Sequence, residues 1–166
     1  MERGLAPSRS RAQAIIRMGK LRCAGRVVGK AGELLPGDAE LDLVAPDHPW
    51  VSRGGVKLSE ALRRFALSPQ GRVCLDLGAS TGGFTEVLLA EGAARVYAVD
   101  VGHDQLAPAL SADPRVISLE GVNARNLDGS LVTEPVAAIV CDVSFISARK
   151  VLDPALALAA LDCWLL

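Results

Sequence analysis

The sequence predicts an α/β fold in which a parallel sheet is preceded by a small α+β unit. From Arg72 onward, near-continuous apolar runs alternate with helix-like segments, a pattern typical of parallel strands that are covered on both faces. A polar residue follows each run closely, and a glycine-rich loop follows the first run. The four runs span residues 73–77, 96–99, 116–119 and 136–141.

The predicted N-terminal unit covers residues 1–44. A short helix is expected to begin near Ser10, which can start a capping box, and to end at Gly19. Residues 21–28 are typical of a tight hairpin, and residues 39–44 alternate as a strand does. Basic side chains crowd this unit: Arg9, Arg11, Arg17, Lys20, Arg22, Arg26 and Lys30.

The formal net charge of −1 hides an uneven distribution of charge along the chain. Residues 1–72 carry 13 Lys/Arg and 7 Asp/Glu, a net charge of +6, whereas residues 73–166 carry 5 and 12, a net charge of −7. A basic half joined to an acidic half indicates that the basic half meets a polyanion. A solvated basic face without a partner is the simpler alternative.

A linker is expected at residues 45–55, because two prolines fall within its first six residues. The second domain is expected at residues 56–166. Its first segment is helical, since Leu58, Leu62 and Phe65 recur at the spacing of one helix face.

Polar side chains at the ends of the apolar runs predict one shared site. Asp76, Asp100, Asn123 and Asp142 each end or follow one of the four runs. In an open parallel sheet the carboxyl ends of the strands share one edge, and ligands bind in the crevice outside that edge. We therefore expect these four side chains to converge, although they are scattered in the sequence.

A glycine-rich loop, DLGASTGGF at residues 76–84, joins the first run to a helix. Glycine permits a tight turn, and the free amides at the start of a helix face a ligand. Asp100 ends the next run, where a carboxylate can accept hydrogen bonds from ribose hydroxyls. The pattern predicts an adenosine-containing cofactor, bound by Asp76, Gly78, Ser80, Gly82, Gly83, Phe84, Asp100 and Asn123.

Three ligand classes compete for this loop, and a loop that merely turns the chain is a further alternative. A nicotinamide dinucleotide needs glycine where Ser80 stands, because the backbone must approach the pyrophosphate there. Residues 78–82 also match the G-x-S-x-G turn of serine hydrolases, but His103 lies too close to the second run to complete a triad. S-adenosylmethionine carries no phosphate and accommodates Ser80, so it is the favoured cofactor.

Cysteine spacing and the lengths of the apolar runs bear on metal binding and location. The four cysteines form no CxxC pair, and the chain has only two histidines, so a zinc site is not expected. The N-terminus lacks the apolar core of a signal peptide, and no run approaches the roughly 18 uninterrupted apolar residues of a membrane span. We expect a cytoplasmic protein with no metal and no membrane as partners.

Four motifs, taken in order, carry a family resemblance. They are HPWVSRGGVKL at residues 48–58, the loop at 76–84, YAVDVG at 97–102 and CDVSFIS at 141–147. Together they resemble the TlyA family, hemolysin-like ribosomal RNA 2′-O-ribose methyltransferases. The resemblance implies a Rossmann-like domain that uses S-adenosylmethionine, with ribosomal RNA or a ribosomal subunit as partner. It also implies that residues 1–44 are an RNA-binding domain of the ribosomal protein S-four type.

The resemblance further implies roles for individual residues. Such ribose methyltransferases use a lysine–aspartate–lysine–glutamate tetrad, in which Lys57 matches the first lysine and Asp142 the aspartate. Lys150 does not match the second lysine, which is expected with the glutamate beyond Leu166. The sheet is therefore expected to be incomplete at its C-terminus, and the N-terminal domain to be clipped. The expected RNA-binding residues are Arg9, Arg11, Arg17, Lys20, Arg22, Arg26 and Arg53.

Three functions follow as hypotheses. The leading one is a ribosomal RNA 2′-O-ribose methyltransferase, in a fragment that we expect to be inactive alone. The second is a non-catalytic RNA-binding remnant. The third is a membrane-lytic protein, suggested by the hemolysin name in the family, although the sequence offers no amphipathic pore segment.

Overall fold

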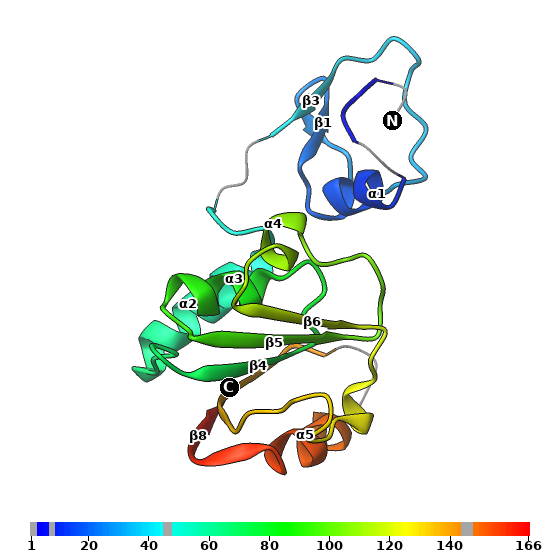
Figure 1. The fold of residues 1–166 in the computed structure, drawn as a ribbon. Helices are drawn as coiled ribbons and strands as arrows, with labels where there is room; N and C mark the ends of the chain where they lie inside the picture. The colour runs from blue at the N-terminus through cyan, green and yellow to red at the C-terminus, as the bar shows by residue number, and fades with distance from the viewer. Residues whose placement is uncertain (1–2, 7–8, 45–47, 144–147) are drawn as a thin grey trace. The chain divides into compact units, whose positions relative to one another are not determined.

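The fold was analysed in a computed structural model of the 166-residue chain, which describes residues 3–6, 9–44, 48–143 and 148–166. The side chains of Ser10, Arg11, Ala14 and Ala148 also lie outside the described part. The chain forms two compact units, residues 1–49 and 50–166 (Figure 1).

The N-terminal unit packs one helix against a three-stranded antiparallel sheet of order β2-β1-β3. Ala24 and Gly25 both have positive φ, 47° and 78°, which is the conformation of the two-residue turns that suit the twist of a hairpin. The predicted helix, hairpin and following strand are confirmed. The elements are α1 (Arg9–Arg17), β1 (Leu21–Cys23), β2 (Arg26–Val27) and β3 (Leu41–Leu43).

The second unit contains a five-stranded sheet of order β6-β5-β4-β7-β8 in which every neighbouring pair is parallel. The predicted fold class and the four predicted strands are confirmed. The strands are β4 (Val73–Leu77), β5 (Arg95–Asp100), β6 (Val116–Glu120), β7 (Val136–Cys141) and β8 (Ala159–Leu165). The helices are α2 (Arg53–Phe65), α3 (Gly83–Ala90), α4 (Pro108–Ser111), the 3-10 turn η1 (Ala124–Asn126) and α5 (Ala148–Leu156).

Strand β8 adds to the predicted strands. Its apolar pattern is interrupted by Asp162, which is exposed and forms an ion pair with Arg72 at 2.9 Å between Nη1 and Oδ2. The charged side chain is thereby accommodated outside the core, so the strand forms in spite of it.

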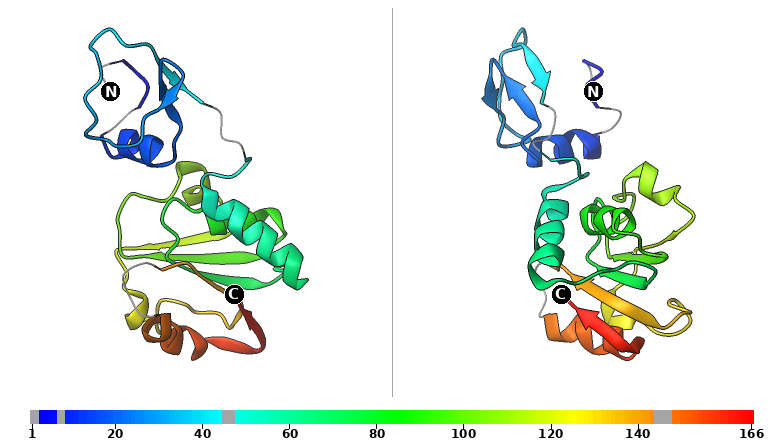
Figure 2. Two further views of the ribbon diagram at one scale, coloured as in Figure 1. Left: turned by 180° about the vertical axis from the view of Figure 1, so that it is seen from behind. Right: turned by 90° about the vertical axis from the view of Figure 1, so that its left-hand side faces the viewer.

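Helices cover both faces of the sheet (Figure 2). Alternate residues of the strands form two apolar cores, one on each face. On one face Cys74, Val96 and Val140 pack with side chains from α2, α3 and α4. On the other face Leu75 and Ile139 pack with side chains from η1 and α5. Among the described residues, no helix combines the length and apolarity needed to cross a bilayer.

Helix α2 buries the predicted apolar stripe only in part. Leu58 and Leu62 are buried, whereas Phe65 is 60% exposed. Phe65 is the last residue of the helix, and Ala66 then turns the chain back in the left-handed conformation. The ring therefore lies at the end of the stripe rather than over the sheet.

Candidate active site

The parallel register brings three aspartates to one edge of the sheet. Asp76 lies near the end of β4, Asp100 ends β5, and Asp142 directly follows β7. β4 lies between β5 and β7. The charges of Asp100 and Asp142 both raise the pKa of Asp76, so both carboxylates lie within electrostatic range of Asp76.

Asp76 is the buried member of this group, with 1% of its surface exposed. Its Oδ2 accepts a hydrogen bond of 2.7 Å from Thr85 Oγ1 on α3. Its Oδ1 is buried and has no hydrogen-bond partner among the described residues. Burial raises the pKa of Asp76 to about 7, against the lowering effect of the hydrogen bonds from Thr85. A buried acceptor left open in this way is unusual in a folded protein.

The glycine-rich loop leaves β4 in a conformation that L side chains avoid. Gly78 has a φ of +86°, and a Cβ there would lie 3.0 Å from the carbonyl oxygen of Asp142. The amides of Gly78 and Ala79 both donate to the carbonyl of Val99, at 2.9 and 3.0 Å. These two bonds hold the start of the loop against the end of β5.

Asp100 has a structural task besides the one expected of it. Its Oδ2 accepts from the amide of Ser80 and its Oδ1 from the amide of Gly102, both at 2.8 Å. Ser80 has a φ of 48°, a strained value for a residue with a side chain. A carboxylate offers about four acceptor positions, so two remain for a ligand.

Lys57 and Asp142 meet although 85 positions separate them. The ammonium Nζ of Lys57 lies 2.7 Å from Oδ1 of Asp142 and 5.9 Å from the centre of the Phe84 ring. The two charged side chains are 64% and 47% exposed, so their pairing adds little to stability. Because this exposed ion pair contributes little to folding stability, its position beside the glycine-rich loop is better explained by a chemical role.

Close packing of two helix starts fixes Lys57 in this position. A Cβ on Gly83 would lie 2.1 Å from Ser52 Oγ and 2.9 Å from the amide nitrogen of Gly55. The first turn of α3 therefore lies directly against the first turn of α2. Lys57 lies one turn further along α2, where its side chain reaches Phe84 and the loop.

The remaining predicted cofactor residues have different surroundings. Phe84 is buried, and Gly82 begins α3 with a φ of 94°. The Oδ1 of Asn123 accepts from the amide of Arg125 at 3.1 Å and so caps η1. This carbonyl oxygen is used locally, and a role of Asn123 toward a ligand stays a prediction.

The predicted RNA-binding residues lie on both units. Arg9, Arg17 and Arg22 are exposed, and Lys20 is half-buried. Arg26 is exposed and forms an ion pair with Glu33 at 2.5 Å. Arg53, also exposed, begins α2 in the second unit, and the Arg11 side chain lies outside the described part.

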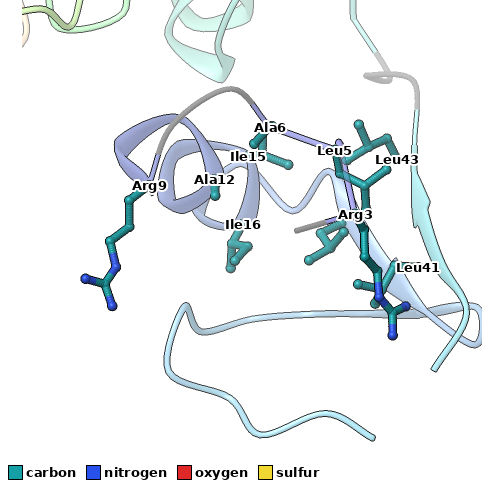
Figure 3. Close-up of a pocket in the computed structure, with 10 residues that line it drawn as sticks. Arg3, Leu5, Ala6, Arg9, Ala12, Ile15, Ile16, Leu41 and Leu43 are labelled. Atoms are coloured by element: carbon teal, nitrogen blue, oxygen red, sulfur yellow. The ribbon is translucent and has the colours of Figure 1, made fainter. Parts of the chain in front are cut away.

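The N-terminal unit also contains a cavity of about 540 Å³ between α1 and the sheet (Figure 3). Aliphatic side chains dominate its lining, and Arg9 extends away from them into solvent. This cavity has no paired acids or bases, in contrast to the sheet edge of the second unit. It is lined by Arg3, Leu5, Ala6, Arg9, Ala12, Ile15, Ile16, Leu21, Leu41 and Leu43.

Three residues that the motifs did not identify complete the site. Thr85 supplies the hydrogen bond to Asp76, Glu120 binds two amides of the loop after β5, and Gln105 contacts Ser80. Glu120 carried a signal, because it ends β6 as Asp100 ends β5. The other two act through contacts that span nine and 25 positions, which no local pattern reveals.

Comparison with protein families gives one match that covers most of the chain. Residues 50–165 match the family model described as FtsJ-like methyltransferase. The matched segment corresponds closely to the second compact unit and contains all three aspartates.

Individual relatives extend the similarity into the N-terminal unit. The chain is 47% identical over 163 residues to the 16S/23S rRNA (cytidine-2′-O)-methyltransferase TlyA of Mycobacterium tuberculosis, covering 98% of this chain and 61% of the relative. It is 43% identical to Hemolysin A of Brachyspira hyodysenteriae, covering 89% of this chain and 62% of that protein. A solved structure of a hemolysin-named protein from Streptococcus thermophilus is 40% identical with a TM-score of 0.68, covering 96% of this chain and 59% of that chain. The chain thus spans about three-fifths of the length of these relatives.

The raised pKa of Asp76 predicts a dependence of stability on pH. The usual pKa of 3.8 rises to about 7 in the folded protein, so the folded state binds this proton more tightly than the unfolded state does. The stability that this proton provides is full below pH 4 and is lost as the pH rises toward 7. Asp76→Asn, which stays neutral, should match the wild type near pH 4 and exceed it by roughly 2–4 kcal/mol at pH 8. Urea unfolding at a series of pH values measures this, and a constant difference between the two proteins would contradict it.

Proposed function

Because this chain belongs to the FtsJ-like methyltransferase family, we propose that it binds S-adenosylmethionine at the carboxyl edge of its sheet and directs the methyl group to a ribose 2′-hydroxyl of ribosomal RNA. The predicted resemblance to the TlyA family is confirmed by 47% identity to a TlyA protein. The observation that carries the proposal is the Lys57–Asp142 pair, held at 2.7 Å beside the glycine-rich loop. A ribosomal RNA substrate implies action in the cytoplasm.

The described residues fit this cofactor. Asp100 keeps free acceptor positions for ribose hydroxyls, and the first turn of α3, which begins at Gly83, offers backbone amides for a carboxylate. The open, buried Oδ1 of Asp76 suits the ammonium group of the methionine part. Asn123, three positions after the end of β6, is assigned to the adenine ring. S-adenosylmethionine supplies a methyl group that its sulfonium charge has already activated.

We assign Lys57 and Asp142 to the alignment of the acceptor hydroxyl and to electrostatic stabilisation. The Lys57 ammonium can hold the oxygen of an acceptor hydroxyl, while Asp142 fixes the direction of the lysine side chain. Fixing the geometry of two reacting groups is often the larger share of catalysis. The Lys57 ammonium lies over the face of the Phe84 ring, which stabilises it through a cation–π interaction.

The cofactor assignment is tested by calorimetry. Asp100→Ala should abolish binding of S-adenosylmethionine, because it removes the ribose acceptor and releases the amides of Ser80 and Gly102. Asp153→Ala, which changes an exposed carboxylate on α5, is the matched control and should bind as the wild type does. A wild-type chain that binds ribosomal RNA but no S-adenosylmethionine would favour the alternative, a non-catalytic RNA-binding protein.

The charge pair should discriminate between cofactor and product. Asp142→Asn leaves the Lys57 charge uncompensated near the sulfonium. The affinity for S-adenosylmethionine should therefore fall by roughly two- to five-fold relative to the affinity for S-adenosylhomocysteine, whose sulfur is uncharged. Lys57→Met should shift the ratio of the two affinities in the opposite direction. Calorimetry with both compounds on each variant gives the ratios. If neither variant changes the ratio, the pair does not face the methyl donor.

The N-terminal unit is assigned to ribosomal RNA through its exposed arginines. Contacts to phosphates release counterions, so affinity should fall at least ten-fold between roughly 50 and 200 mM salt. Arg17→Ala combined with Arg22→Ala should weaken binding and flatten this dependence. Arg63→Ala, on α2 and paired with Glu60 at 2.6 Å, serves as control. Filter binding with ribosomal RNA measures both effects. An affinity that does not change with salt concentration would contradict the assignment of the N-terminal unit to RNA.

A further inference from the structure

The loop that follows β5 is fastened directly to the glycine-rich loop. Glu120 Oε1 accepts from the amides of Gln105 and Leu106, at 2.7 and 3.0 Å. The amide of Ala107 donates to the carbonyl of Thr81 at 3.2 Å. Buried Leu106 packs so closely on Gly82 that a Cβ there would lie 2.7 Å from its Cδ1. The backbone of Gln105 therefore has a fixed place beside the site.

The Gln105 side chain extends from this fixed backbone toward Asp100. Its Oε1 accepts a hydrogen bond of 3.3 Å from Ser80 Oγ. Its amide nitrogen occupies the space above Gly102, where a Cβ would lie 1.6 Å from Nε2 and 3.2 Å from Asp100 Oδ1. A donor group thus lies next to the carboxylate, in room that only a glycine leaves open.

The chemistry of this pair complements a sugar diol. Asp100 offers only acceptors, whereas the Gln105 Nε2 offers only donors. A ribose hydroxyl both donates and accepts, so one hydroxyl can satisfy both neighbours at once. We propose that Gln105 is a second ribose-binding residue that works with Asp100 on the adenosyl group. This inference rests on the proposed function and adds to it a second side chain that hydrogen-bonds the ribose hydroxyls.

A double-mutant cycle tests the proposal, with S-adenosylhomocysteine as the ligand. Gln105→Ala removes the amide, and Gly102→Ala displaces it by occupying its space, so each should weaken binding by about five-fold. The double variant should be no weaker than the single ones, because both changes remove the same contact. Gln70→Ala, which removes an exposed glutamine side chain near Gly92, is the matched control and should leave affinity unchanged.

A ligand change separates direct contact from an effect through Ser80. With an S-adenosylhomocysteine analogue that lacks both ribose hydroxyls, Gln105→Ala should bind as tightly as the wild type. Equal affinity of wild type and Gln105→Ala for the natural compound, additive losses in the cycle, or an undiminished loss with the analogue would each overturn the inference and leave the proposed function intact. A wild-type chain that does not bind S-adenosylhomocysteine would overturn both. Circular dichroism confirms that each variant is folded.

Discussion

The backbone hydrogen bonds of β4 with its two neighbours are the constraint on which the site depends. The register places Leu77 opposite Val99 on one side and opposite Cys141 on the other. The same pattern continues past the strand ends, since the amides of Gly78 and Ala79 donate to Val99. The amide of Asp142 likewise donates to the carbonyl of Leu77. The chain is thus still held by sheet-like bonds where the functional side chains begin, which gives an exposed edge the rigidity of the core.

Much of the sheet could be predicted because its strands are buried on both faces. Strands β4 and β7 begin and end where their predicted runs do, since burial on two sides requires mainly apolar residues, with Asp76 as the exception in β4. Strand β8 escaped prediction because an edge position tolerates Asp162 within the run. The exposure of Phe65 could not be predicted, because helical spacing gives the face of a helix but not how far the sheet beneath it extends.

The site was predictable only as far as it follows from strand order. Asp76, Asp100 and Asp142 could be grouped from the sequence, because parallel strands share one carboxyl edge. Lys57 lies on a helix before the sheet, and only the family resemblance connected it with Asp142. The contact of Gln105 with Ser80 joins two loops whose paths depend on tertiary packing. Such contacts have no periodicity and therefore leave no pattern in the sequence.

The packing of Gly83 against Ser52 and Gly55 has a mechanical consequence. The first turns of α2 and α3 are in close contact at Gly83. They have little room to slide past each other, so they move together as one piece. One end of this piece continues from the glycine-rich loop, and the other carries Lys57. A displacement of the loop at the start of α3 would therefore press on the start of the helix that carries Lys57.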